Sequence, residues 1–175
     1  MRWITLLVVL GVAATASAQT AAMNPWGRGT TLELFGGAAT TSPDTTGTFG
    51  AAVGWELTQR FEIQGAGAWF AQRHRADEFA AGFRLLTNLT RPSRIVPYVA
   101  GGAGLYRGTF DRTRAETDPT GVIAGGAHLY VSRHLSIRPE AAVRFVTAHS
   151  RAYRVTTVTF ALAYHVEEHA AANSR

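Results

Sequence analysis

The sequence predicts an all-β fold, an eight-stranded antiparallel up-and-down barrel that crosses a membrane. Three observations predict it. Residues alternate with a period of two along eight segments of the chain. The alternation separates an apolar face from a face that carries charges of both signs. The connections alternate between short turns and longer polar loops, as in even-stranded barrels of outer membranes.

The alternation is clearest between Gly121 and Phe145. The first half of this segment alternates up to residues 132–134, which form a predicted turn. In the second half one face is apolar, and the opposite face carries Arg138, Glu140 and Arg144. No helix would gather these three charges and also align the apolar residues. The segment therefore predicts an antiparallel hairpin with two unlike faces.

The chain begins with the pattern of a secretory signal peptide. Met1–Arg2 is positive, Trp3–Val12 is an apolar run, and small residues precede a predicted cleavage after Ala18. About ten apolar residues are too few to span a bilayer as a helix, which argues against a transmembrane anchor. Residues 1–18 are therefore predicted to direct export, and residues 19–28 are predicted to be a flexible lead-in.

The composition of the predicted exported chain limits its number of domains, its chemistry and its partners. Its 157 residues (175 − 18) are enough for one domain and contain no long apolar run. The absence of cysteine excludes disulfides and thiolate chemistry. All 17 basic residues are arginine. The 16 arginines that follow the signal peptide, together with the 12 acidic residues, give a net charge of about +4. This scattered charge does not predict a nucleic-acid partner.

The barrel is predicted over residues 29–166, followed by a polar tail at 167–175. Its expected strands are Gly29–Ala39, Gly47–Thr58, Phe61–Gln72, Asp77–Leu89, Ile95–Thr109, Gly121–Val131, Leu135–Val146 and Ala152–Val166. In the glycine-rich fifth strand the facing stays open, because either of two sets can point outward: Val99, Ala103 and Leu105, or Tyr98, Ala100 and Tyr106. Longer polar loops are expected at Thr40–Thr46, Arg73–Ala76, Phe110–Pro119 and Ala148–Arg151.

The charged face is predicted to line the lumen, since the apolar face of a membrane barrel meets lipid. The expected lumen charges are Glu33, Glu56, Glu62, Glu78, Arg84, Arg138, Glu140 and Arg144. Eight strands leave just enough room for side chains to fill the interior, where such charges can pair. They are interpreted as a packed salt-bridge network. The alternative is a narrow ion path that depends on Arg138, Glu140 and Arg144.

Aromatic residues near the strand ends predict two interfacial girdles. The turn-side girdle comprises Trp55, Phe61, Tyr98 and Tyr164, and the loop-side girdle comprises Phe49, Trp69, Phe79 and Tyr153. Arginine suits phosphate recognition. The arginines of the outer loops are therefore candidate contacts for lipopolysaccharide phosphates: Arg73, Arg75, Arg112, Arg114 and Arg151.

The chain resembles the small outer-membrane β-barrel family related to the OmpA and OmpX barrels. The carriers are the signal peptide, Pro97–Gly108, Gly125–Phe145 and the final strand segment VTFALAY. The resemblance implies a monomeric, non-enzymatic envelope protein without cofactor or metal. Its implied partners are outer-membrane lipids, lipopolysaccharide and the barrel-assembly machinery. One departure is that such barrels usually end on an aromatic residue, whereas about eleven residues follow Tyr164.

Two other functions stay open at this point. An outer-membrane lipid-modifying enzyme would use the adjacent His149 and Ser150, although no orienting acid accompanies them. A soluble secreted lipocalin-like barrel would bind an apolar ligand, but it would need a polar exterior that the second, fourth and eighth strands do not offer. The six histidines show no metal-ligand spacing.

Overall fold

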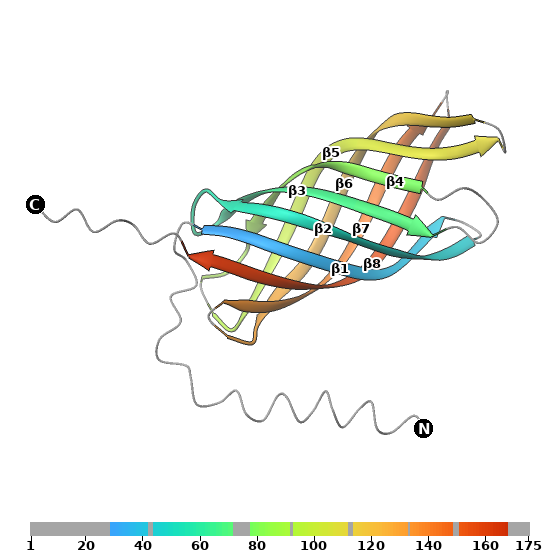
Figure 1. Ribbon diagram of the computed structural model, residues 1–175. Coiled ribbons are helices and arrows are strands. Elements are labelled where there is room, and N and C mark those ends of the chain that lie inside the picture. The colour runs from blue at the N-terminus through green and yellow to red at the C-terminus, as the bar shows by residue number, and fades with distance from the viewer. Residues whose placement is uncertain are drawn as a thin grey trace, which may run out of the picture.

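The computed structural model is a closed barrel in which each strand pairs with its neighbours in sequence and the first pairs with the last (Figure 1). This confirms the predicted eight-stranded antiparallel barrel. The structure describes residues 29–41, 44–71, 78–91, 93–111, 114–132, 134–148 and 151–167. The strands are β1 (Gly29–Thr41), β2 (Asp44–Glu56), β3 (Phe61–Ala71), β4 (Glu78–Asn88), β5 (Ile95–Asp111), β6 (Arg114–Tyr130), β7 (Leu135–Ala148) and β8 (Arg151–Glu167).

No helix among the described residues is long and apolar enough to cross a membrane. The predicted signal peptide, the lead-in and most of the tail lie outside the described residues.

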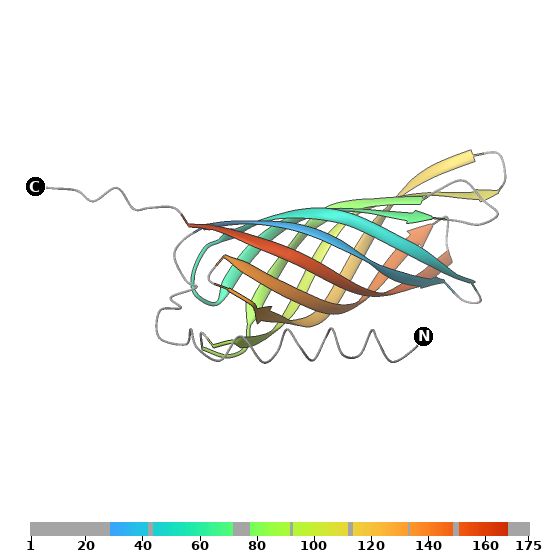
Figure 2. The same ribbon diagram turned by 60° about the horizontal axis from the view of Figure 1, so that its bottom comes forward.

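The strand registers fix how the barrel closes. One outward-facing row runs from Thr30 once around the barrel and returns to β1 at Thr40, ten positions further along (40 − 30). Ten residues at ~3.3 Å each, set against eight spacings of ~4.8 Å, correspond to a strand tilt of ~40°. Figure 2 shows the strands running obliquely to the long axis. Such a barrel has a narrow interior that side chains can fill.

The strands extend further at the loop end than predicted. Three of the four expected loop ranges are therefore wrong, because they include residues of the strands. β1 and β2 pair up to Thr41 and Asp44, and β7 and β8 pair up to Ala148 and Arg151. The expected loop at residues 110–119 lies largely within β5 and β6, which pair as far as Asp111 and Arg114. Apolar alternation ends before the strands do, because strand pairing continues with polar residues above the apolar belt.

The two faces have the predicted polarity. Large apolar side chains on the outer face of the strands are exposed, including Leu34, Phe83, Ile123 and Phe160. The alternate residues are buried inside, charged ones included. The undecided facing of β5 is now resolved: Val99, Ala103 and Leu105 point outward, while Tyr98, Ala100 and Tyr106 point into the lumen.

The apolar belt has the height of a bilayer core. On the outer face of β5 it runs from Ile95 to Leu105 and ends at the exposed Arg107. The ten steps between these residues (105 − 95), each with an axial rise of ~2.5 Å that follows from the tilt, cover ~25 Å. This agrees with the apolar band of ~25 Å in outer-membrane barrels.

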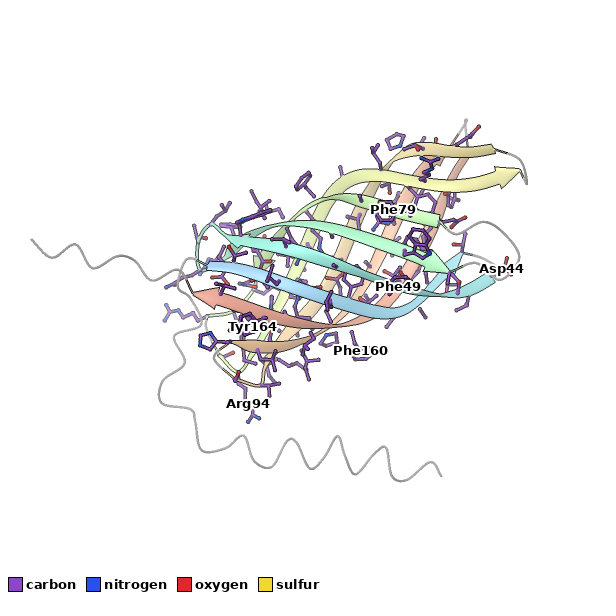
Figure 3. All side chains as sticks on the ribbon, in the orientation of Figure 1. Asp44, Phe49, Phe79, Arg94, Phe160 and Tyr164 are labelled. Carbon is purple, nitrogen blue, oxygen red and sulfur yellow. The ribbon has the colours of Figure 1, made fainter. Side chains whose placement is uncertain are left out.

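The belt is bordered by aromatic side chains, with two corrections to the predicted girdles. Phe49 and Phe79 point outward toward one end of the barrel and Tyr164 toward the other, with Phe160 between them (Figure 3). Tyr98 and Tyr153 do not belong to the girdles, because their positions in the alternation turn them toward the lumen.

Candidate functional site

The centre of the lumen holds a closed network of charged and polar side chains. We call it the charge ring, formed by Glu33, Gln64, Arg84, Tyr98, Arg138 and Glu140. Arg138 donates a hydrogen bond to Glu33, and Gln64 donates to the same carboxylate oxygen at 2.9 Å. Arg84 donates to the amide oxygen of Gln64 at 2.5 Å and to Glu140 at 2.6 Å.

Three further contacts complete the charge ring. The hydroxyl of Tyr98 donates to Glu140 at 2.6 Å. Nη2 of Arg138 lies 3.9 Å from Glu140, and its guanidinium lies 4.9 Å from the ring centroid of Tyr98. The ring thus joins β1, β3, β4, β5 and β7 across the interior.

The charge ring is electrically balanced. It contains two carboxylates and two guanidinium groups, and each carboxylate accepts from two donors. Arg138 is only 1% exposed and Glu33 only 5%. Charges this deeply buried stay ionised only when partners replace their lost hydration. Mutual pairing therefore allows the charges to occupy the middle of the lumen.

Below the charge ring, the turn-side end of the lumen holds a second polar group around His165. Its Nε2 lies 3.0 Å from the hydroxyl of Ser136, and its Nδ1 lies 3.2 Å from the hydroxyl of Thr31 and 3.7 Å from Glu56. Tyr130 packs against the His165 ring, with centroids 5.3 Å apart. These contacts satisfy polar groups that face inward at the mouth of the barrel.

Ser136, His165 and Glu56 have the order of groups found in serine hydrolases, but their setting does not suit catalysis. Ser136 is completely buried, so a substrate carbonyl cannot approach its hydroxyl. The histidine also lies closer to Thr31 than to Glu56. Within the described part of the chain, no group of three or more histidines and carboxylates is placed to hold a metal ion.

The loop-side end of the lumen is closed mainly by apolar packing. Phe70, Tyr106, Val146 and Val155 belong to one buried cluster, against which Phe35 and Tyr153 pack. Tyr106 also donates a hydrogen bond to Glu78 at this end. The rings of Phe70 and Tyr106 lie 5.7 Å apart. This group is the loop-side cluster.

Between the charge ring and the loop-side cluster lies a cavity of about 60 Å³. It exists because several inward positions carry no side chain. A Cβ atom on Gly82 would lie 2.5 Å from the carbonyl oxygen of Ala103, and one on Gly104 would lie 2.2 Å from that of Ala81. β4 and β5 approach so closely that these positions require glycine. The missing side chains leave space beside Arg84 and Arg144.

All eight predicted lumen charges point inward, but they have different surroundings. Glu33, Arg84, Arg138 and Glu140 belong to the charge ring, Glu56 lies beside His165, and Glu78 is bonded to Tyr106. The Glu62 carboxylate packs against Gly54, and Arg144 lines the cavity.

Sequence reasoning missed the contribution of Gln64 and Tyr98 to the ring. The inward position of Gln64 was readable from alternation. The role of Tyr98 was not, because the facing of its strand was open.

Five of the other predicted site residues lie outside the described residues: Arg73, Arg75, Arg112, His149 and Ser150. Arg114 and Arg151 begin β6 and β8 at the loop end, but their side chains are not described.

A closed barrel of eight strands, with an apolar belt outside and ion pairs inside, defines the class of small outer-membrane β-barrels. Solved structures agree. The N-terminal barrel domain of Pseudomonas aeruginosa OprF aligns with a TM-score of 0.61 at 11% identity, covering 79% of this chain and 99% of that one. Neisserial surface protein A aligns with a TM-score of 0.63 at 10% identity, covering 81% and 97%.

Ail, the attachment invasion locus protein of Yersinia pestis, aligns with a TM-score of 0.51 at 9% identity over 81% of this chain and 99% of that one. No protein-family model matches the sequence, and no curated protein matches it either. The chain therefore has the fold of the small eight-stranded outer-membrane barrels, and the similarity is one of structure.

We predict that Glu33 and Arg138 are strongly coupled in stability. Arg138→Met alone leaves Glu33 buried without its cation and should cost about 3–5 kcal/mol of unfolding free energy. The double variant Glu33→Gln/Arg138→Met should recover most of this loss. Urea unfolding of the refolded barrel in detergent measures each variant. Arg154→Met, which removes an exposed arginine, serves as the control; simple additivity of the two lumen substitutions would contradict the prediction.

Proposed function

We propose that the protein is a non-enzymatic integral protein of the bacterial outer membrane, with a structural or surface-interaction role. The observation that carries the proposal is the combination of an apolar belt of ~25 Å outside with a paired, filled lumen. A soluble ligand-binding barrel needs the opposite arrangement, with an apolar interior and a wet exterior. The belt would expose an apolar surface much larger than soluble monomers tolerate.

The non-enzymatic part of the proposal is supported by the described lumen, in which the members of the charge ring bond to one another. Neither the Ser136–His165 pair nor the charge ring offers an exposed nucleophile. The neighbouring structures OprF, Neisserial surface protein A and Ail share the fold, and two of them have names that indicate surface roles. This favours an envelope element over a lipid-modifying enzyme.

The proposal predicts that the mature chain folds only in the presence of detergent or lipid. Refolded in detergent micelles, it should migrate faster on a gel before boiling than after, because the closed barrel resists unfolding by dodecyl sulfate. In buffer without detergent the same chain should aggregate, since the apolar belt has no covering. A monomer that is soluble, rich in β-structure and indifferent to boiling would overturn the membrane assignment.

A second prediction concerns the lumen. The charge ring and the loop-side cluster both close the interior, so the barrel inserted in a planar bilayer should carry no steady current. Phe70→Ala/Tyr106→Ala, which thins the loop-side cluster, should still conduct poorly because the charge ring remains. A steady wild-type current that changes with Arg138→Met or Arg144→Met would instead support the narrow ion path.

For the surface role, we propose contacts between loop-side arginines and lipopolysaccharide phosphates. Phe49, Trp69 and Phe79 are cross-strand neighbours on β2, β3 and β4 and form an aromatic row. The next residue in this row is Arg107 on β5. Both Arg107 and Arg154 are exposed on the outer face just beyond the belt. Positive charge at this height would meet the phosphates of the outer leaflet, where the bidentate geometry of arginine is favourable. The candidate contacts are Arg73, Arg75, Arg112, Arg114 and Arg151.

Replacing these five arginines with glutamine should weaken binding of purified lipopolysaccharide to the detergent-solubilised barrel, with a smaller salt dependence. The matched control replaces arginines of the turn-side end, which face the opposite leaflet: Arg60, Arg91 and Arg94. Equal loss of binding in both variants would refute a contact specific to the loop side.

A further inference from the structure

The cavity above the charge ring has an unusual lining for a buried space. Its floor includes Glu33, Arg84 and Glu140 of the charge ring, and Arg144 enters from β7 nearer the loop-side cluster. The hydroxyl-bearing Thr157 and Thr159 line the β8 side. The remaining lining is mostly small or apolar. The cavity is therefore a small space with two guanidinium groups and two carboxylates at its wall.

Arg144 stands outside the pairing that links the other charges at the cavity. Glu33 and Glu140 already accept hydrogen bonds from Arg138, Gln64, Arg84 and Tyr98 within the charge ring. Arg144 has no ion pair or hydrogen bond with any residue that the structure describes, and its Nε atom is buried. The guanidinium of Arg144 therefore lines the cavity with N–H donors that no described residue accepts.

N–H donors away from bulk water that find no acceptor are costly, and proteins normally pair them. An anion in the cavity would accept hydrogen bonds from the unpaired guanidinium of Arg144. Arg144 can offer several N–H donors to it, and the two threonine hydroxyls can donate from β8. A volume of about 60 Å³ has room for a small inorganic anion with a few waters.

We propose that this cavity is a binding site for a small inorganic anion of the size of chloride, held by Arg144 with Thr157 and Thr159. The bound anion neutralises Arg144 and stabilises the folded barrel. The site is closed on one side by the charge ring and on the other by the loop-side cluster. It is thus a structural ion site within the lumen.

Chloride provides the test, because a ligand that binds only the folded state stabilises it by mass action. Urea unfolding of the refolded barrel in a non-ionic detergent is followed while chloride replaces gluconate at constant ionic strength. The folded-to-unfolded ratio should rise by the factor 1 + [chloride]/Kd, about elevenfold at ten times Kd. No dependence on chloride would overturn the proposal.

Arg144→Met removes the unpaired guanidinium and keeps an apolar chain of similar length. It should abolish the chloride dependence, and in gluconate it should be at least as stable as the wild type. Arg154→Met is the matched control, since it removes an exposed arginine from the outer face. It should keep the full chloride response. An unchanged chloride response in Arg144→Met would show that chloride acts elsewhere, and the site would be refuted.

In a second variant, a carboxylate of the protein takes the place of the bound anion. Thr157 pairs with Ala142 on β7, and the next inward pair along the same strands is Arg144 with Val155. A carboxylate in Thr157→Glu would therefore lie beside Arg144. This variant should lose the chloride response while remaining folded at low chloride. Crystals grown in bromide give a direct check: an anomalous peak beside Arg144 supports the site, and peaks confined to exterior arginines overturn it.

Discussion

The closure of eight strands with a stagger of ten residues is the constraint on which the rest of the structure depends. It sets the tilt and makes the interior so narrow that every inward side chain meets others from distant strands. Glu33 and Arg138 are 105 positions apart in the chain, yet their side chains bond across the lumen. Because water cannot solvate this interior freely, inward charges need partners, and four of the eight predicted lumen charges find them in the charge ring.

The same closure places the two faces of every strand in opposite surroundings. Outward residues form an apolar belt that needs lipid, while inward residues form layers that follow one another along the axis. The layers are the polar group around His165, the charge ring, the cavity and the loop-side cluster. Hydrogen bonding dominates the first two layers and apolar packing the last. The cavity lies where inward glycines let β4 and β5 approach and leave no side chains to fill the space.

This layering separates the roles that the protein can serve. The filled lumen favours an envelope element over a channel, and the buried Ser136 argues against hydrolysis even though it lies near a histidine and a carboxylate. The loop-side rim remains available to partners, and there Arg107 follows the aromatic row. Within the lumen, Arg144 lines the cavity without an ion pair or hydrogen bond to any described residue.

Alternation by itself determined much of this protein: the number of strands, the two faces, and which charges point inward. These follow from the sequence because a period of two needs no knowledge of distant residues. The facing of β5 stayed open, since glycine, alanine and aromatic residues occupy both of its faces. The strand ends at the loop side were predicted wrongly, because apolar alternation stops where the belt stops. Only the tertiary structure decided that Gln64 and Tyr98 complete the charge ring, and that Arg144 has no place in it. Such pairings depend on the stagger between strands, and a stagger is a property of the closed barrel that no single strand contains.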